Sequence, residues 1–214
     1  KAMNLFPIHK ILLTHAHLKL CLPLPRILKQ MEGEEVEILA HENAIDILKN
    51  PKELNEFFEY SVEPIENVTP LKENDIIDIN GFEIEIFELF GHTQDSIGVY
   101  DKKHKNIFVG DAIIDHLDKD TYTPVLYGPH FNEKSLLKTY AKLDEMKTEL
   151  NSISLAHFGV YSEVDFINLV ESVKEKYFNA KDSIIKWYLE NADLDYISEK
   201  YQENIIPNSN IFPK

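Results

Sequence analysis

The segment Ile11-Leu-Leu-Thr-His-Ala-His17 carries the clearest architectural signal in this chain. Its three apolar residues are typical of a short buried strand, and the polar residues from Thr14 onward begin where that strand ends. In α/β sheets, ligands bind at strand ends along one edge of the sheet. The segment therefore predicts a strand that brings His15 and His17 to a binding edge.

Three more strand ends carry residues of the same kind. Each follows a predicted apolar strand: His92 after residues 82–90, Asp111 after residues 107–109, and His157 after residues 153–155. Any one of these is weak evidence, because a histidine or a Gly-Asp turn at a strand end is common. Four together are hard to attribute to chance. If the four loops converge, they offer four imidazoles and one carboxylate, a ligand set that suits zinc, with iron as the second choice.

The rest of the chain alternates strands, hairpins and helices. Residues 75–88 predict a hairpin around Asn80-Gly81, the pair that a type I′ turn favours. Residues 97–100 and 106–109 predict a second hairpin, and residues 36–39 a further strand. A capping box from Ser162 to Asp165 is predicted to open one of the helices. The predicted helices cover residues 25–31, 43–48, 51–58, 132–150, 162–178, 182–190 and 194–201. This order predicts a mixed α/β layer protein.

Composition excludes several classes of protein. Acidic residues number 37 and basic residues 22, so the formal charge of −15 disfavours nucleic acid and anionic membranes as partners. No apolar run approaches the roughly 20 residues of a membrane span. The 214 residues suit a single domain, residues 1–214. Cys21 is the only cysteine, which excludes an internal disulfide and predicts a reducing, cytoplasmic location.

The other five histidines lack a strand-end context. We expect His104 to be a solvated turn residue and His9 and His41 to be partly exposed. His116 and His130 could line the mouth of a cleft, although an ordinary surface role is favoured for both.

Taken together, the chain resembles the metallo-β-lactamase-fold superfamily, in particular its glyoxalase II-like hydrolase branch. The resemblance covers most of residues 8–160 and is specific. It rests on the segments Ile11–His17, Gly91-His-Thr-Gln-Asp-Ser-Ile-Gly98, Phe108-Val-Gly-Asp-Ala112 and Leu155-Ala-His-Phe-Gly159. The implied fold is a four-layer αββα sandwich with a metal site at one edge of its two sheets. Residues 8–160 would form the core and residues 161–214 the C-terminal helices.

The resemblance also implies roles for the strand-end residues. The first metal would keep its ligands His15, His17 and His92. Asp111 would be the bridging aspartate, and His157 the remaining ligand of a second metal.

One departure concerns that second metal. The family motif T-H-x-H-x-D-H is replaced here, with Lys19 at the aspartate and Leu20 at the final histidine. A cationic side chain repels a divalent ion, so we expect at most one tightly held metal. Zinc is the expected ion, with iron or manganese as alternatives.

Another departure is the short N-terminal part. Family members usually have two or more strands before the first motif, whereas 14 residues precede His15. The sequence therefore predicts that N-terminal strands of the sandwich are missing from this chain. Their loss would expose sheet edges and favour a homodimer.

The implied function is metal-dependent hydrolysis of a small-molecule ester, thioester or lactone by a metal-bound hydroxide. Asp111 would accept or orient the proton of the water, and Lys19 would stabilise the oxyanion in place of the second metal. Alternatively, Lys19 forms an ion pair with Asp111 in a degenerate protein that serves as a binding scaffold. An iron-dependent oxidoreductase on the same fold is a further alternative.

Overall fold

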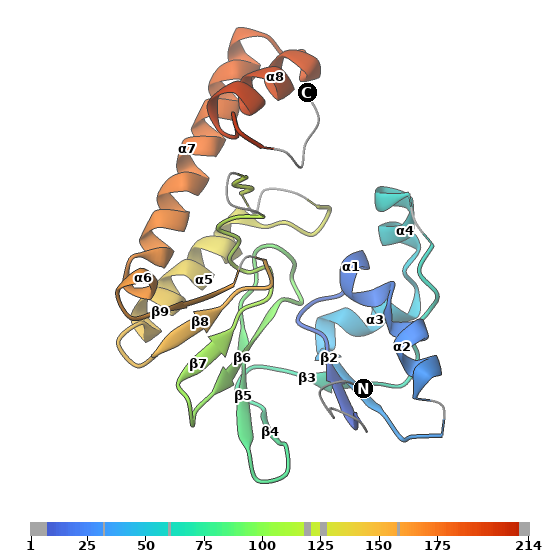
Figure 1. Ribbon diagram of the computed structural model, residues 1–214. Helices are drawn as coiled ribbons and strands as arrows, with labels where there is room; N and C mark the ends of the chain where they lie inside the picture. The colour runs from blue at the N-terminus through green and yellow to red at the C-terminus, as the bar shows by residue number, and fades with distance from the viewer. Residues whose placement is uncertain are drawn as a thin grey trace.

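Two β-sheets lie face to face in the computed structural model, which describes residues 8–31, 33–59, 61–117, 121–124, 128–157 and 159–209 (Figure 1). The smaller sheet is parallel, with the order β1 (Lys10–Leu12), β2 (Glu37–His41), β3 (Val68–Leu71). The larger sheet has the order β4 (Ile76–Asp78), β5 (Glu83–Glu88), β6 (Ile97–Asp101), β7 (Asn106–Phe108), β8 (Ser152–Ser154), β9 (Val160–Ser162). Its strands pair antiparallel except for the parallel pair β7–β8.

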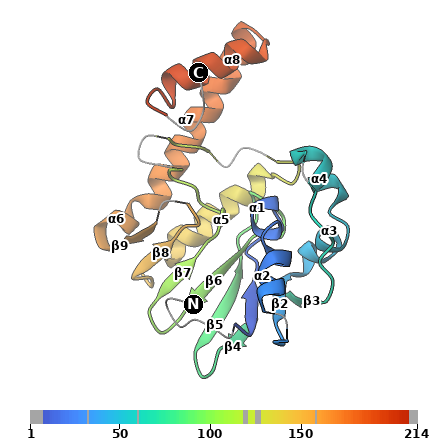
Figure 2. The ribbon, with the colours of Figure 1, turned by 45° about the vertical axis from the view of Figure 1, so that its right-hand side comes forward.

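Helices cover the outer face of each sheet (Figures 1 and 2). The smaller sheet is covered by α1 (Leu18–Cys21), α2 (Leu24–Gln30), η1 (Glu42–Ala44), α3 (Ile45–Lys49) and α4 (Lys52–Phe58). The larger sheet is covered by α5 (Glu133–Met146), α6 (Glu163–Ile167) and α7 (Leu169–Glu190), and α8 (Leu194–Asn204) packs on the far end of α7. The predicted four-layer αββα arrangement is confirmed. No helix in the described part of the chain has both the length and the apolar composition that a bilayer crossing requires.

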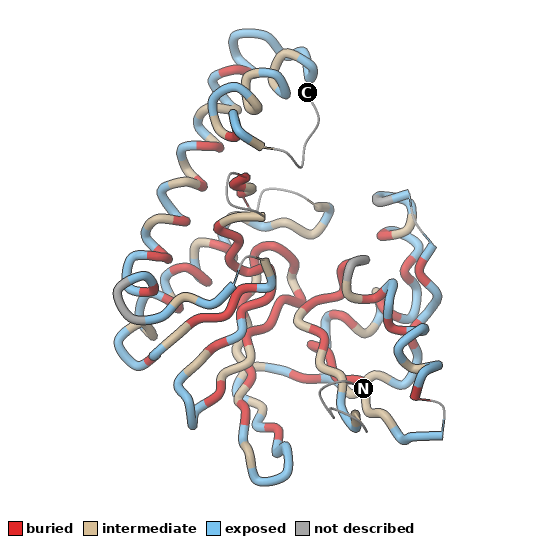
Figure 3. The backbone as a smooth tube through the Cα atoms, in the orientation of Figure 1, coloured by how far each residue is buried: buried red, intermediate tan, exposed pale blue. Residues whose placement is uncertain are grey.

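Side-chain alternation along the strands builds the core. In β2, Ile38 and Ala40 pack toward the helices, whereas Leu39 packs toward the larger sheet. In β5, Ile84 and Ile86 join the cluster between the sheets. Buried residues accordingly recur along the strands of both sheets (Figure 3). Each such side chain contributes roughly 1.5–3 kcal/mol by leaving water, so the two sheets are held together without a disulfide.

Both predicted hairpins are confirmed. Asn80 and Gly81 have φ angles of 55° and 84°, as a type I′ turn requires. The flanking residues Ile79 and Phe82 exchange backbone hydrogen bonds of 2.7 and 3.2 Å. The second hairpin joins β6 to β7. Helix α5 begins as predicted after Asn132, whose side chain accepts a hydrogen bond from the Ser135 N–H.

The C-terminal helices differ from the prediction. A helix begins after Ser162 as predicted, but the expected capping box is wrong, because the Ser162 side chain makes no cap hydrogen bond. Ser162 is also the last residue of β9, where it pairs with Ser152. The helix that follows breaks at Asn168. The predicted helices 162–178 and 182–190 therefore become short α6 and the continuous 22-residue α7. Helix α7 runs on through residues 179–181 because Tyr177, Ala180 and Trp187 bury one continuous face. Strands β3 and β9 and helix α1 were not predicted.

A buried carboxylate joins the loop after β7 to α7. Asp115 accepts hydrogen bonds from Tyr161 Oη at 2.8 Å and Lys176 Nζ at 2.6 Å, and His116 Nδ1 lies 2.6 Å away. Burial by itself raises the pKa of Asp115. The bonds from Lys176 and Tyr161 outweigh that effect and hold the pKa below its ordinary value of 3.8.

We expect Asp115→Asn to lower the free energy of unfolding by about 2 kcal/mol at pH 7, because charge-assisted hydrogen bonds are lost. The stabilisation from a depressed carboxyl pKa is complete above the unfolded value and disappears as the pH falls through the folded value. Urea titrations should therefore show the difference from wild type shrinking below pH 3.8. Asp144→Asn, which removes an exposed ion pair with Lys147, is the control and should change stability by under about 0.5 kcal/mol. A difference for Asp115→Asn that is independent of pH would contradict this account.

Candidate metal centre

Five of the predicted site residues reach one edge of the sandwich from the ends of four strands. His15 and His17 follow β1, His92 follows β5, Asp111 follows β7 and His157 follows β8. The Ile97 N–H donates to the Thr14 carbonyl at 2.8 Å, which ties the loop after β1 to the start of β6.

Three histidines form a buried cluster at this edge. Donor nitrogens of His15, His17 and His92 all lie within 4.8 Å of one another, and His92 Nε2 is 2.9 Å from His17 Nδ1. The three residues are 3%, 6% and 0% exposed. Zinc–nitrogen bonds of about 2.0–2.1 Å place tetrahedral nitrogens about 3.3 Å apart, so the cluster fits one small divalent ion.

Asp111 lies between this cluster and His157. Its Oδ2 is 3.7 Å from His15 Nε2 and 3.8 Å from His92 Nε2, while its Oδ1 is 3.5 Å from His157 Nε2. Burial by itself raises the pKa of Asp111. The bond to His157 and the neighbouring imidazoles of His15 and His92 outweigh burial and lower the pKa to about 2. Asp111 is therefore a carboxylate at neutral pH, and its negative charge favours a cation in the cluster.

The imidazole of His17 stays neutral. Burial, reinforced by the proximity of His15 and His92, lowers the pKa of His17 from 6.5 to about 2. A neutral imidazole keeps a lone pair available, which is the form that binds metal ions.

Gly110 allows Asp111 to approach the histidine loop. Its φ of 54° is in the left-handed region, and a Cβ there would lie 2.8 Å from Thr14 Oγ1. The Gly-Asp sequence therefore serves close packing between the loops after β1 and β7.

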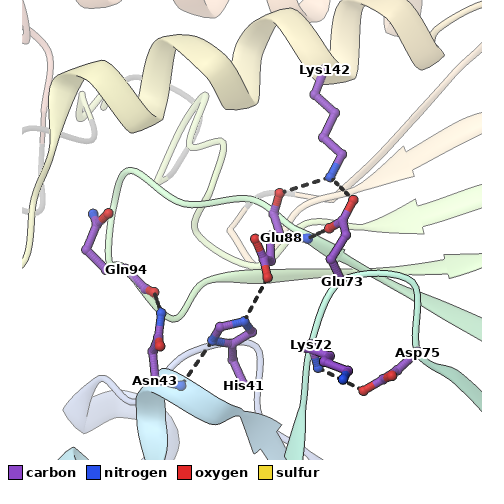
Figure 4. A network of polar contacts seen from close by, with 8 residues as sticks. All are labelled: His41, Asn43, Lys72, Glu73, Asp75, Glu88, Gln94 and Lys142. Carbon is purple, nitrogen blue, oxygen red and sulfur yellow. Dashed lines mark hydrogen bonds and ion pairs between the residues drawn. The ribbon is translucent and has the colours of Figure 1, made fainter.

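His41 is buried, contrary to the sequence prediction, at 2% exposure. Its Nδ1 accepts the Asn43 N–H at 3.1 Å, which leaves Nε2–H to donate to Glu88 Oε1 at 3.3 Å (Figure 4). Asn43 Nδ2 in turn donates to the Gln94 carbonyl at 2.7 Å. The loop between β5 and β6, which contains His92, is therefore anchored to the end of β2 by these contacts.

The same network continues to α5. Lys142 donates to Glu73 Oε1 at 2.5 Å and to the Glu88 carbonyl at 3.3 Å (Figure 4). Glu73 also accepts the Glu88 N–H. Both ends of the loop between β5 and β6 are therefore fixed by polar contacts with other elements.

The remaining predicted residues lie elsewhere or are not described. The Lys19 side chain lies outside the described part of the structure, so its predicted role stays a prediction. Leu20 packs against the apolar cluster beneath the smaller sheet. His104 is a turn residue as predicted, with a side chain that is 63% exposed and paired with Asp101. His130 Nε2 lies 3.7 Å from Glu53 Oε2. Sequence reasoning missed Asp95, which is buried beside the histidine loop.

Comparison with known families identifies the architecture. The family described as the metallo-beta-lactamase superfamily matches residues 30–157, more than half of the chain. The chain belongs to the metallo-β-lactamase superfamily. The matched region contains His92, Asp111 and His157, whereas His15 and His17 precede it. The glyoxalase II-like branch stays a prediction.

Several solved structures share this fold. The archaeal superfamily protein ST1585 from Sulfolobus tokodaii is 18% identical, with a TM-score of 0.64 over 84% of this chain and 70% of that protein. TTHA1623 in a di-iron-bound form is 20% identical, with a TM-score of 0.56 over 75% of this chain and 74% of that one.

The metallo-β-lactamase family protein TTHA1429 from Thermus thermophilus is 18% identical, with a TM-score of 0.62 over 82% of this chain. This chain spans 62% of the length of TTHA1429. No curated protein sequence matches the chain significantly.

Proposed function

We propose that this protein is a hydrolase that uses one metal ion to cleave small esters, thioesters or lactones. Zinc is the favoured ion. The observation that carries the proposal is the buried cluster of His15, His17 and His92 with the Asp111 carboxylate within 3.7–3.8 Å of two of its nitrogens. Three histidines with a free fourth position are the arrangement of catalytic rather than structural zinc.

A bound divalent ion would supply Lewis-acid activation of water and of a carbonyl group. With a pKa of about 2, Asp111 is a weak base at neutral pH. Its oxygens are therefore suited to accept hydrogen bonds and orient a water molecule rather than to keep its proton. His157, whose side chain is 25% exposed and whose Nε2 lies 3.5 Å from Asp111 Oδ1, places a polar group between that carboxylate and solvent.

We propose a single tightly held ion. Leu20, which replaces the final histidine of the family motif, packs into the apolar cluster and offers no donor atom. In the part of the chain that the structure describes, Asp111 and His157 are then the remaining family ligands for a second ion. Lys19 would supply positive charge to an oxyanion in its place.

The test is hydrolysis by chelator-treated protein before and after one equivalent of Zn²⁺, on a panel of short-chain aryl esters, acyl thioesters and lactones. We expect no activity before reconstitution and recovery with one equivalent. Asp111→Asn should lower kcat about 10²-fold or more, and Lys19→Ala should lower kcat without changing metal content. Asp144→Asn on the surface of α5 is the control and should be unchanged. Turnover that survives metal removal would refute the proposal.

A second candidate is an iron-dependent oxidoreductase. Two histidines and one carboxylate are the ligand set of non-haem iron, and His15, His92 and Asp111 lie close enough to supply it. TTHA1623, which shares the fold, is described in a di-iron-bound form. Emission spectroscopy of the purified protein distinguishes zinc from iron, and protein without any metal would favour the scaffold alternative.

A further inference from the structure

Asp95 connects the two loops that carry the three histidines. It lies three residues after His92 and is 2% exposed. Its Oδ2 accepts the N–H of Ala16 at 2.7 Å, across 79 residues of sequence. Ala16 is the residue between His15 and His17, so this one hydrogen bond fixes the backbone at the centre of the His-x-His segment.

The loop that holds Asp95 is itself anchored. Gln94 Nε2 donates to the His130 carbonyl at 3.0 Å, and the Gln94 carbonyl accepts from Asn43 at 2.7 Å. The loop of His92 is therefore fixed in place, and the Asp95–Ala16 hydrogen bond holds the loop of His15 and His17 against it.

A neutral acceptor would satisfy one backbone N–H, so the negative charge needs a separate explanation. Burying a carboxylate is costly unless a cation or several hydrogen bonds compensate for the lost water. In the part of the chain that the structure describes, Asp95 forms no ion pair, and its hydrogen bond is the one from Ala16. Burial and the proximity of Asp95 raise the pKa of the Cys21 thiol to about 12, so that neighbour is neutral as well.

We propose that Asp95 is a positioning residue of the metal centre, and that its charge is compensated by the cation held by His15, His17 and His92. The hydrogen bond sets the spacing of His15 and His17, and the carboxylate lowers the electrostatic potential at the cluster. The inference rests on the proposed metal site but not on the proposed reaction.

Two substitutions separate the two effects. Asp95→Asn keeps an acceptor for the Ala16 N–H and removes the charge, whereas Asp95→Ala removes both. Asp101→Asn is the matched control. Asp101 is also buried and accepts a backbone N–H, that of His104 at 2.9 Å, but it is the last residue of β6, at the opposite end of that strand from the His92 loop. The readouts are the Zn²⁺ dissociation constant by chelator competition, the visible spectrum of the Co²⁺-substituted protein, and the melting temperature of the metal-free protein.

We expect Zn²⁺ binding to weaken about 5- to 10-fold in Asp95→Asn and about 10- to 100-fold in Asp95→Ala, the range for residues that orient metal ligands. The Co²⁺ spectrum should change in Asp95→Ala and remain near wild type in Asp95→Asn. The metal-free Asp95→Asn protein should melt at or above the wild-type temperature, because an uncompensated buried charge has been removed. Asp101→Asn should melt lower and bind Zn²⁺ within about twofold of wild type.

Wild-type Zn²⁺ affinity in both Asp95 variants would overturn the inference while leaving the proposed hydrolase intact. A metal-free Asp95→Asn protein that melts well below wild type would show that a cation of the chain itself, such as Lys19, compensates the carboxylate, and this would also overturn it. A wild-type protein that binds Zn²⁺ but hydrolyses none of the panel would refute the proposed function and leave the role of Asp95 standing.

Discussion

Replacing His92 with alanine is expected to weaken Zn²⁺ binding about 10³-fold or more. His92 is fully buried, and its Nε2 lies 2.9 Å from His17 Nδ1 and 3.8 Å from Asp111 Oδ2, which places it at the centre of the site. Loss of a residue that only orients a ligand costs 10- to 100-fold in metal affinity, so loss of a ligand atom should cost more. Chelator competition measures the affinity, and circular dichroism verifies that the variant is folded.

His104→Ala is the control for that experiment, because its side chain is 63% exposed in the turn between β6 and β7. This variant should bind Zn²⁺ as the wild type does. An unchanged affinity in folded His92→Ala would show that the metal, if one binds, is held elsewhere.

We expect Gly91→Ala to lower the free energy of unfolding by about 3–5 kcal/mol, because it combines overpacking with backbone strain. A Cβ on Gly91 would lie 2.5 Å from the Leu136 Cα, which belongs to the backbone of α5 and cannot rotate away. The φ of 145° is also one that side chains rarely adopt. Because the Gly91 carbonyl accepts the Asn132 N–H at 2.8 Å, the displacement should reach the start of α5 and the neighbouring His92. Urea denaturation measures the loss of stability.

Gly33→Ala isolates the contribution of the backbone. Gly33 has a φ of 96°, but a Cβ there would have no atom within 4 Å, so only the conformational cost of about 1–2 kcal/mol applies. Equal losses in the two variants would contradict the close approach of α5 to the histidine loop. Zn²⁺ affinity should fall in Gly91→Ala and be unchanged in Gly33→Ala.

Local patterns predicted the parts of the fold that local physics determines. The Asn80-Gly81 hairpin follows from the positive φ angles that this pair tolerates, and Asn132 caps α5 through its own side chain. Ser162 shows the opposite case. Ser162 stands at the N-cap position of α6, as its sequence predicts, but its side chain makes no cap hydrogen bond, and its backbone also pairs with Ser152 in β9, which the local pattern does not reveal.

The candidate site likewise contains residues that local sequence patterns reveal and residues that they do not. Histidines and aspartate at strand ends are visible in the sequence, because apolar runs mark where strands stop. The importance of Asp95 depends on a hydrogen bond to Ala16, 79 residues away, which no local pattern reveals. The burial of His41 likewise depends on Glu88, which follows it by 47 residues.

The measurement that tests this account most directly is the metal content of the wild-type protein purified without chelators. Elemental analysis should find one divalent ion per chain, and the same preparation of His92→Ala should contain essentially none. A wild-type chain that retains no ion and takes up none from added Zn²⁺ would contradict a metal centre at His15, His17 and His92.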